Sequence, residues 1–166
     1  MKNNIYPKNY QSLLNLVDTQ IAIKLIKDTF ERELAKELNL MRVSAPLFVE
    51  PETGLNDNLS GFEKAVSFEV NEDEKNLEIV QSLAKWKRYA LDKYNIDGLY
   101  TDMNAIRRFE ETDNLHSLYV DQWDWERRLA PEERKMSTLK RVVKRIYKAF
   151  IKTYNALVKR YPVLQN

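Results

Sequence analysis

Apolar residues recur at steps of three or four along two segments of the chain, and this spacing predicts two amphipathic helices. The first helix covers about residues 18–38, with Asp18 or Thr19 as its N-cap. The second begins near Ser137 and ends at Pro162, because proline cannot continue a helix. The apolar positions are Ile23, Ile26, Phe30, Leu34 and Leu38 in the first helix, and Leu139, Val143, Ile146, Phe150, Tyr154, Leu157 and Tyr161 in the second.

Shorter stretches with strand-like alternation fill the segment between these two helices. The predicted strands are 41–50, 65–70, 77–81, 98–107 and 116–126. A third helix is predicted over 82–94, with Ser82 as its cap. Pro46 removes a ladder donor, so the first strand should lie at a sheet edge or bend there. The expected fold class is α+β, a mainly antiparallel sheet flanked by helices, in a single domain over residues 1–166.

Composition excludes several kinds of chemistry. The 166 residues include no cysteine, which excludes disulfides, thiolate catalysis and cysteine-bound metals. His116 is the single histidine, so a site with several histidine ligands is excluded as well. No apolar run approaches the roughly 20 residues of a membrane span, and residues 1–11 lack the apolar core of a signal peptide. We therefore expect a cytoplasmic protein without a membrane partner.

Charge is distributed unevenly along the chain. Residues 135–166 contain nine Lys or Arg and no Asp or Glu. Such a segment can bind a polyanion, but a helix packed against acidic neighbours with its lysines in water is the preferred interpretation, so no nucleic-acid partner is expected. The whole chain has only three glycines, and neither common glycine-rich phosphate-loop motif occurs.

The segment VDQWDWE, residues 120–126, mixes tryptophans with carboxylates in one predicted strand. Alternation puts Gln122 and Asp124 on one face and Asp121, Trp123 and Trp125 on the other. Gln122 and Asp124 would lie about 7 Å apart and point the same way. A carboxylate beside an amide is suited to binding an ammonium group. The alternative is a solvated face of an edge strand, and the residues alone do not separate the two.

Basic residues accompany this strand. Lys85, Lys87 and Arg88 lie early in the predicted helix 82–94, where cations oppose the helix dipole unless an anion binds. Arg107 ends the strand that precedes VDQWDWE, and a guanidinium there can bind a carboxylate or phosphate through two hydrogen bonds. Exposed helix lysines and a surface salt bridge to Glu110 are the competing interpretations. Together the groups would suit a zwitterionic small molecule plus a phosphate.

Four motifs carry a family resemblance. They are DNLSG at 57–61, SLAKWKR at 82–88, GLYTDMNAIR at 98–107 and HSLYVDQWDWER at 116–127. In this order and spacing they closely resemble the ammonia-dependent asparagine synthetases, or aspartate–ammonia ligases, from about residue 18 to the end. The resemblance implies a core like that of class II aminoacyl-tRNA synthetases. It places motif 1, which forms a homodimer interface, at about 18–50, and motif 2 at about 105–126.

The resemblance also implies a reaction and a set of roles. The family uses ATP and Mg²⁺ to convert L-aspartate into β-aspartyl-adenylate, which ammonia attacks to give L-asparagine and AMP. Arg107 and Lys87 would be catalytic, with Arg107 bridging the reacting carboxylate and the α-phosphate and Lys87 pairing with a substrate carboxylate. The substrate ammonium would be held by Asp57, Gln122 and Asp124, and the nucleotide side would be lined by Ser82, Leu115 and His116.

Two departures from the family pattern change these expectations. Gln81 stands where many members have histidine, and both side chains can donate a hydrogen bond. The chain also ends before motif 3, which supplies a glycine-rich segment and acidic groups for Mg²⁺, so we expect no metal ligands here and impaired activity of the 166-residue chain alone. The alternative function is a non-catalytic, synthetase-like binding module that holds a protein or RNA through its basic C-terminal helix. The tryptophan face of the strand should pack under a helix, with Asp121 as a structural hydrogen-bond acceptor.

Overall fold

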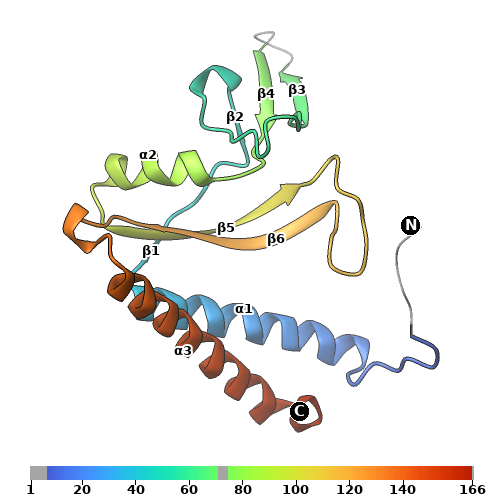
Figure 1. The fold of residues 1–166 in the computed structure, drawn as a ribbon. Helices are drawn as coiled ribbons and strands as arrows, with labels where there is room; N and C mark the ends of the chain where they lie inside the picture. Colours follow the sequence, from blue (N-terminus) through green and yellow to red (C-terminus); the bar gives the residue numbers. More distant parts are fainter. Residues whose placement is uncertain (1–6, 71–74, 166) are drawn as a thin grey trace. The chain divides into compact units, whose positions relative to one another are not determined.

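The computed structural model describes residues 7–70 and 75–165 and divides them into two units. Unit 1 contains residues 42–70 and 75–127, and unit 2 contains residues 7–41 and 128–165. The elements are α1 (Leu16–Leu38), β1 (Met41–Arg42), β2 (Phe48–Val49), η1 (Pro51–Thr53), β3 (Ser67–Val70), β4 (Lys75–Ile79), α2 (Ala84–Tyr94), β5 (Gly98–Ile106), β6 (Tyr119–Arg127), η2 (Pro131–Glu133), α3 (Met136–Arg160) and η3 (Pro162–Leu164). Figure 1 shows their course.

The described strands form two three-stranded sheets, with strand orders β1-β5-β6 and β2-β4-β3. The pairs β2–β4, β3–β4 and β5–β6 are antiparallel, which confirms the predicted fold class. Pro46 separates β1 from β2, and each of these short strands lies at the edge of its own sheet. The prediction that this segment lies at a sheet edge or bends at Pro46 is therefore confirmed for the edge position. Residues 71–74, for which a charged turn between the strands 65–70 and 77–81 is predicted, lie outside the described residues, and Lys75 begins β4.

The core of unit 1 lies between α2 and one face of the β5–β6 hairpin (Figure 1). Alternate residues of β5 are buried there, and Leu99 and Ala105 are fully covered. The buried members of this cluster are Val43, Val80, Leu83, Trp86, Ala90, Leu91, Leu99, Met103 and Ala105. Val120 packs against them from β6, so α2 covers the face that also carries Asp124. Trp123 and Trp125 lie on the opposite face of β6, so α2 is not the helix that covers them, and the packing of the tryptophan face under a helix stays a prediction.

Helix α2 begins differently from the sequence prediction. Its N-cap is Leu83, which makes no side-chain cap hydrogen bond, whereas Ser82 was expected there. The Ser82 hydroxyl still accepts a hydrogen bond from the Ala84 N–H, at 3.3 Å. Leu83 is fully buried in the core, so packing of an apolar side chain outweighs the usual preference for a polar cap.

Unit 2 is an antiparallel pair of long helices. The Phe30 and Phe150 rings lie 4.8 Å apart, and Lys152 bridges Glu33 at 2.7 Å and Glu37 at 2.9 Å. Tyr161, directly after α3, donates to Asp18 near the start of α1 at 3.3 Å, whereas Arg145, earlier in α3, donates to the Glu37 carbonyl near the end of α1 at 3.3 Å, so the two helices run antiparallel. None of the helices in the described ranges is long and apolar enough to cross a membrane.

Two details of unit 2 differ from the prediction. Asn15 caps α1, accepting from the Asp18 N–H at 2.8 Å, so the helix begins before the predicted Asp18 or Thr19 cap. The residues of α3 that are buried are small, namely Thr138, Ala149 and Thr153. Much of the predicted apolar stripe is exposed instead, including Leu139, Val143, Phe150 and Tyr154. Small side chains let the two helix backbones approach closely. The positions of α3 that face α1 are therefore occupied by these small residues rather than by the larger apolar ones.

Substitution of Leu99 measures how much the unit 1 core contributes to the stability of the protein. The side chain of Leu99 is 0% exposed, so Leu99→Ala would remove buried apolar surface and leave a cavity. We expect the free energy of unfolding to fall by about 2–5 kcal/mol, measured by urea denaturation. Leu115→Ala is the matched control, because Leu115 is 90% exposed and should change the free energy by less than about 0.5 kcal/mol. Equal effects of the two substitutions would contradict this description of the core.

Candidate functional site

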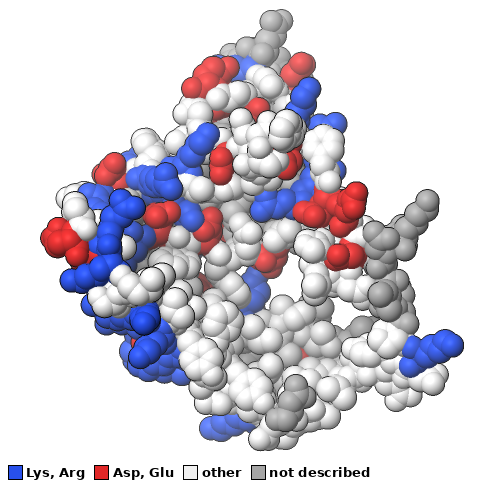
Figure 2. Space-filling model, in the orientation of Figure 1, with Lys and Arg blue, Asp and Glu red and all other residues white. Residues whose placement is uncertain are grey.

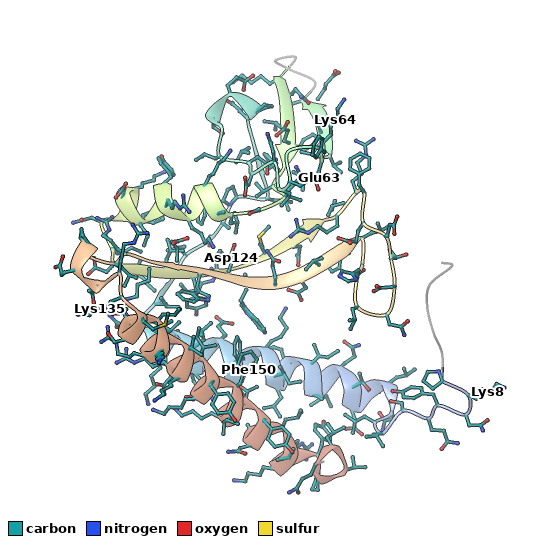
Figure 3. All side chains as sticks on the ribbon, viewed as in Figure 1. Lys8, Glu63, Lys64, Asp124, Lys135 and Phe150 are labelled. Carbon is teal, nitrogen blue, oxygen red and sulfur yellow. The ribbon has the colours of Figure 1, made fainter. Side chains whose placement is uncertain are left out.

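A buried lysine paired with carboxylates of β6 is the central feature of the candidate site. Lys87 lies on α2 with its side chain only 8% exposed, and its Nζ donates to Asp124 Oδ1. It also donates to the Trp125 carbonyl at 3.1 Å and lies 3.8 Å from Glu126 Oε2. These groups meet because α2 packs on the face of β6 that carries Asp124, and Lys87 lies on the side of α2 that faces this strand. Figure 3 labels Asp124 on the side of the hairpin that faces α2.

This cluster holds more negative than positive charge. One ammonium, that of Lys87, faces two carboxylates, those of Asp124 and Glu126. Asp124 is 24% exposed at its side chain and Glu126 31%, so both remain reachable from solvent. Gln122 lies two residues before Asp124 on the same face, and its Nε2 donates to Met103 Sδ at 3.2 Å. The surface beside Lys87 can therefore accept one further cationic group, with the Gln122 carbonyl as a neutral acceptor.

Arg107 extends from the segment directly after β5. Its NH1 donates to the Gln81 carbonyl at 3.0 Å, and its backbone N–H donates to the Leu118 carbonyl at 2.7 Å. The first hydrogen bond uses one of five guanidinium N–H donors, which leaves donors for an anion. The side chain lines a small pocket of about 140 Å³ that is also lined by Leu59, Glu63, Gln81, Arg108, Phe109 and Glu110. Hydrogen bonds from Ser60 lower the pKa of Glu63, so a carboxylate shares this pocket with the two arginines.

Asn56 is a buried residue that the sequence did not single out. Its Oδ1 accepts from the Gln81 N–H at 2.8 Å, and its Nδ2 donates to Glu78 Oε2 at 3.1 Å and to the Ile79 carbonyl at 3.2 Å. Lys85 Nζ donates to the Asn56 carbonyl at 3.4 Å. Asn56 thus ties the 57–61 loop to the end of β4 and, through Gln81, to the carbonyl that holds Arg107. Its partners lie 22 to 29 residues away, so local pattern could not reveal this role.

The loop between β5 and β6 is organised by Asp113. Its Oδ1 accepts from the backbone N–H groups of Leu115 and His116, each at 2.7 Å, and lies 2.9 Å from His116 Nδ1. The Leu115 N–H, followed by His116, lowers the pKa of Asp113 to about 2. The Asp113 carboxylate in turn raises the pKa of His116.

The structure brings some of the predicted site residues together and leaves others apart. Lys87 contacts Asp124, and Arg107 reaches the backbone of Gln81, immediately before Ser82. Asp57 is half-buried beside Asn56, while Leu115 and His116 are exposed in the β5–β6 loop. Asp121 lies on the opposite face of β6, where its register partner is Asn104.

No metal centre is evident in the part of the chain that the structure describes. Residues 7–70 and 75–165 contain no cluster of three or more His, Cys, Asp or Glu side chains that could hold an ion. The residues present therefore do not provide a Mg²⁺ cage.

Solved structures share the fold at low sequence identity. Asparaginyl-tRNA synthetase from Pyrococcus horikoshii, complexed with asparaginyl-adenylate, superposes with a TM-score of 0.57 at 15% identity, covering 84% of this chain and 31% of its own. The Entamoeba histolytica asparaginyl-tRNA synthetase, also with asparaginyl-adenylate, gives 0.54 at 12%, covering 89% and 31%. These likenesses confirm the class II synthetase fold that the motifs predicted.

Sequence relatives identify the family. The aspartate-ammonia ligase family model matches residues 17–166. Proteins named aspartate–ammonia ligase are 59% identical in Clostridium tetani, 58% in Fusobacterium nucleatum and 54% in Clostridium perfringens, covering 96%, 93% and 100% of this chain. The chain spans about half the length of these relatives, 48% of the first two and 51% of the third. The four motifs, the synthetase-like fold and the family match agree, and the chain belongs to the aspartate–ammonia ligase family.

Proposed function

We propose that this chain carries the N-terminal part of the active site of an AMP-forming ligase that makes L-asparagine from L-aspartate, ammonia and ATP. The observation that supports this proposal most directly is the Lys87–Asp124–Glu126 cluster, which pairs opposite charges on a surface reachable from solvent. The family match supports the ligase interpretation, since relatives with this name cover nearly the whole chain. It does not favour the alternative of a non-catalytic binding module.

The ion pair can exchange partners with a zwitterionic substrate. An amino acid carries an ammonium and carboxylates, which are the complements of Asp124 and Lys87. When L-aspartate binds, its ammonium takes the place of Lys87 beside Asp124, with Gln122 and Asp57 as further acceptors. Lys87 then turns to a substrate carboxylate. Each buried charge keeps a partner throughout, so binding leaves no unpaired ion in the interface.

Arg107 serves the phosphoryl-transfer step. The β-carboxylate oxygen of aspartate attacks the α-phosphorus of ATP, the bond to the β-phosphate oxygen breaks, and pyrophosphate leaves. Negative charge builds up on the α-phosphate oxygens, and a guanidinium held by the Gln81 carbonyl can donate to them without reorganising. Ammonia then attacks the acyl carbon, AMP leaves, and a proton is lost from nitrogen. No protein nucleophile is required, because positioning and charge stabilisation suffice.

The nucleotide is assigned to the side of Arg107 that carries Ser82 and the β5–β6 loop with Leu115 and His116. The family reaction also uses Mg²⁺, for which the described residues offer no set of ligands, so none of the steps above depends on the ion.

We further propose that the intact protein acts in the cytoplasm, where ATP is available, and as a homodimer through residues 18–50. The exposed apolar side chains of Ile21 and Ile23 on α1 support such an interface.

Arg107→Ala should slow adenylate formation strongly. Loss of a preorganised donor to the developing charge lowers kcat by about 10²–10³-fold, measured as aspartate-dependent exchange of pyrophosphate into ATP with the intact protein. Arg88→Ala is the matched control, because Arg88 is an exposed arginine on α2 and its loss should leave kcat within about twofold. A kcat for Arg107→Ala within twofold of wild type would remove Arg107 from the mechanism.

Asp124→Asn should weaken aspartate binding selectively. The variant keeps the shape of the side chain but loses the charge that pairs with the substrate ammonium, so KM for aspartate should rise at least about tenfold. KM for ATP should change by less than about twofold. Asp102→Asn is the control, since Asp102 lies on the opposite face of β5 and pairs with Arg42 at 2.8 Å. If Asp124→Asn raises both KM values equally, the residue is structural rather than substrate-binding.

The Asp113–His116 pair should make the β5–β6 loop dependent on pH. The raised pKa of His116 means that its contribution to stability is complete below the ordinary histidine pKa of 6.5 and is lost as pH rises through the higher folded value. The lowered pKa of Asp113 means that its contribution is complete above 3.8 and is lost as pH falls through about 2. The pair is therefore intact between about pH 3.8 and 6.5.

NMR titration of the single histidine measures this directly. We expect a pKa above 6.5 in the wild type and a return toward 6.5 in Asp113→Asn. Glu111→Gln, which removes a nearby carboxylate outside the pair, should leave the pKa of His116 unchanged. A pKa of His116 that is insensitive to Asp113→Asn would contradict the pairing.

A further inference from the structure

A basic groove lies within unit 2, and none of the residues that line it is assigned to the ligase reaction. It has a volume of about 770 Å³ and lies between the C-terminal end of α1 and the N-terminal half of α3. Six cationic side chains line it, those of Lys36, Lys140, Arg141, Lys144, Arg145 and Lys148. Figure 2 shows Lys and Arg side chains gathered over the first half of α3. The volume falls within the range of small-molecule pockets, roughly 300–1,000 Å³.

The cations follow the helical repeat. Lys140, Lys144 and Lys148 are four residues apart, so they lie on one face at steps of about 6 Å and span about 12 Å. Arg141 and Arg145 form a second row beside them. Like charges at this spacing repel one another and destabilise a helix that has no counter-ion. The arrangement is therefore unfavourable unless anions neutralise it.

Carboxylates of unit 2 neutralise only part of this charge. Lys148 pairs with Glu37 at 2.9 Å, and Arg141 is 3.8 Å from Glu133. Glu37 is shared with Lys152, so its capacity is largely used. Among residues 7–70 and 75–165, no carboxylate partners Lys36, Lys140 or Lys144.

Arg145 also keeps donors for a ligand. Its NH1 donates to the Glu37 backbone carbonyl at 3.3 Å, a neutral acceptor that leaves the guanidinium charge uncompensated. Ser137 and Asn39 add neutral polar groups to the groove wall. The groove thus combines several uncompensated charges with hydrogen-bonding groups.

The two ends of the groove limit the length of the anion that fits it. Glu133 lies at the end near the start of α3, and Glu33 and Glu37 lie at the other, both held by Lys152. A long nucleic acid that continued past either end would meet carboxylates. A short, highly charged anion would contact the central lysines, and the one carboxylate that lines the groove, that of Glu37, is already paired with Lys148 and Lys152.

We propose that this groove binds a small anion that carries several linked phosphate groups, such as an inorganic polyphosphate or the polyphosphate chain of a nucleotide. Lys140 and Lys144 are the principal contacts, with Lys36 reaching from α1. The site is distinct from the proposed nucleotide side at Arg107 and does not depend on the proposed ligase activity. Phosphate groups suit it because each offers several charged acceptor oxygens to lysine and arginine donors.

Isothermal titration of inorganic tripolyphosphate into the intact protein tests the proposal at an ionic strength of about 150 mM, where long-range attraction is screened. The wild type should bind, and the double variant Lys140→Gln/Lys144→Gln should bind at least about tenfold more weakly. Both side chains are exposed, so the variant should keep its helical circular dichroism and its Tm. Its aspartate-dependent pyrophosphate exchange should equal that of the wild type.

The matched control removes the same charge elsewhere. Lys93→Gln/Lys159→Gln neutralises two exposed lysines outside the groove and should bind tripolyphosphate within about twofold of wild type. Arg107→Ala should also keep tripolyphosphate binding, which separates this site from the proposed nucleotide site. If Arg107→Ala abolishes binding while the double variant does not, the anion occupies the ligase site and the proposal is wrong.

Two further outcomes would also overturn it. One is the absence of measurable binding by folded wild-type protein. The other is a single-stranded RNA that binds more tightly than tripolyphosphate and loses its affinity in the same double variant. That result would assign the groove to nucleic acid rather than to a small anion.

Discussion

The buried ammonium of Lys87 is the constraint around which unit 1 is organised. A lysine taken out of water needs a partner, and Asp124 supplies one from β6 while the Trp125 carbonyl and Glu126 complete its surroundings. This pair joins α2 to the same face of the β5–β6 hairpin that the apolar residues of β5 cover, so the ion pair and the core act on one interface. The same pair presents one positive and two negative groups near solvent, which is the charge pattern that a zwitterionic amino acid can enter.

A second set of hydrogen bonds prepares the phosphate side of the site. Asn56 is buried and holds the Gln81 N–H, and the Gln81 carbonyl holds Arg107. The guanidinium is thereby oriented by a neutral backbone carbonyl, which leaves further N–H donors for an anion. An arginine held in this way can stabilise an anion with little reorganisation. Lys87 is therefore held by an ion pair that a substrate can replace, whereas Arg107 is held by a hydrogen bond to a neutral backbone carbonyl.

Unit 2 is stabilised differently, because small residues and ion pairs join its two long helices. Ala149 and Thr153 permit a close approach, and Lys152 links Glu33 and Glu37 across it. This arrangement engages Glu33 and Glu37, and among the described residues it leaves Lys140 and Lys144 without a carboxylate partner. The basic groove is therefore a consequence of how the two helices pair, as much as of the lysine content of α3.

The sequence by itself determined the three helices, the strand segments, the antiparallel α+β class and the family, because hydrophobic period and short motifs are local properties. It also placed Gln122 and Asp124 on one strand face. Only the tertiary structure decided that α2 covers this face, that Leu83 rather than Ser82 caps α2, and that Asn56 supports Arg107 through Gln81. It likewise exposed much of the apolar stripe of α3 and buried Ala149 and Thr153. These outcomes depend on packing between segments far apart in the chain, where the closest fit of side chains outweighs local preference.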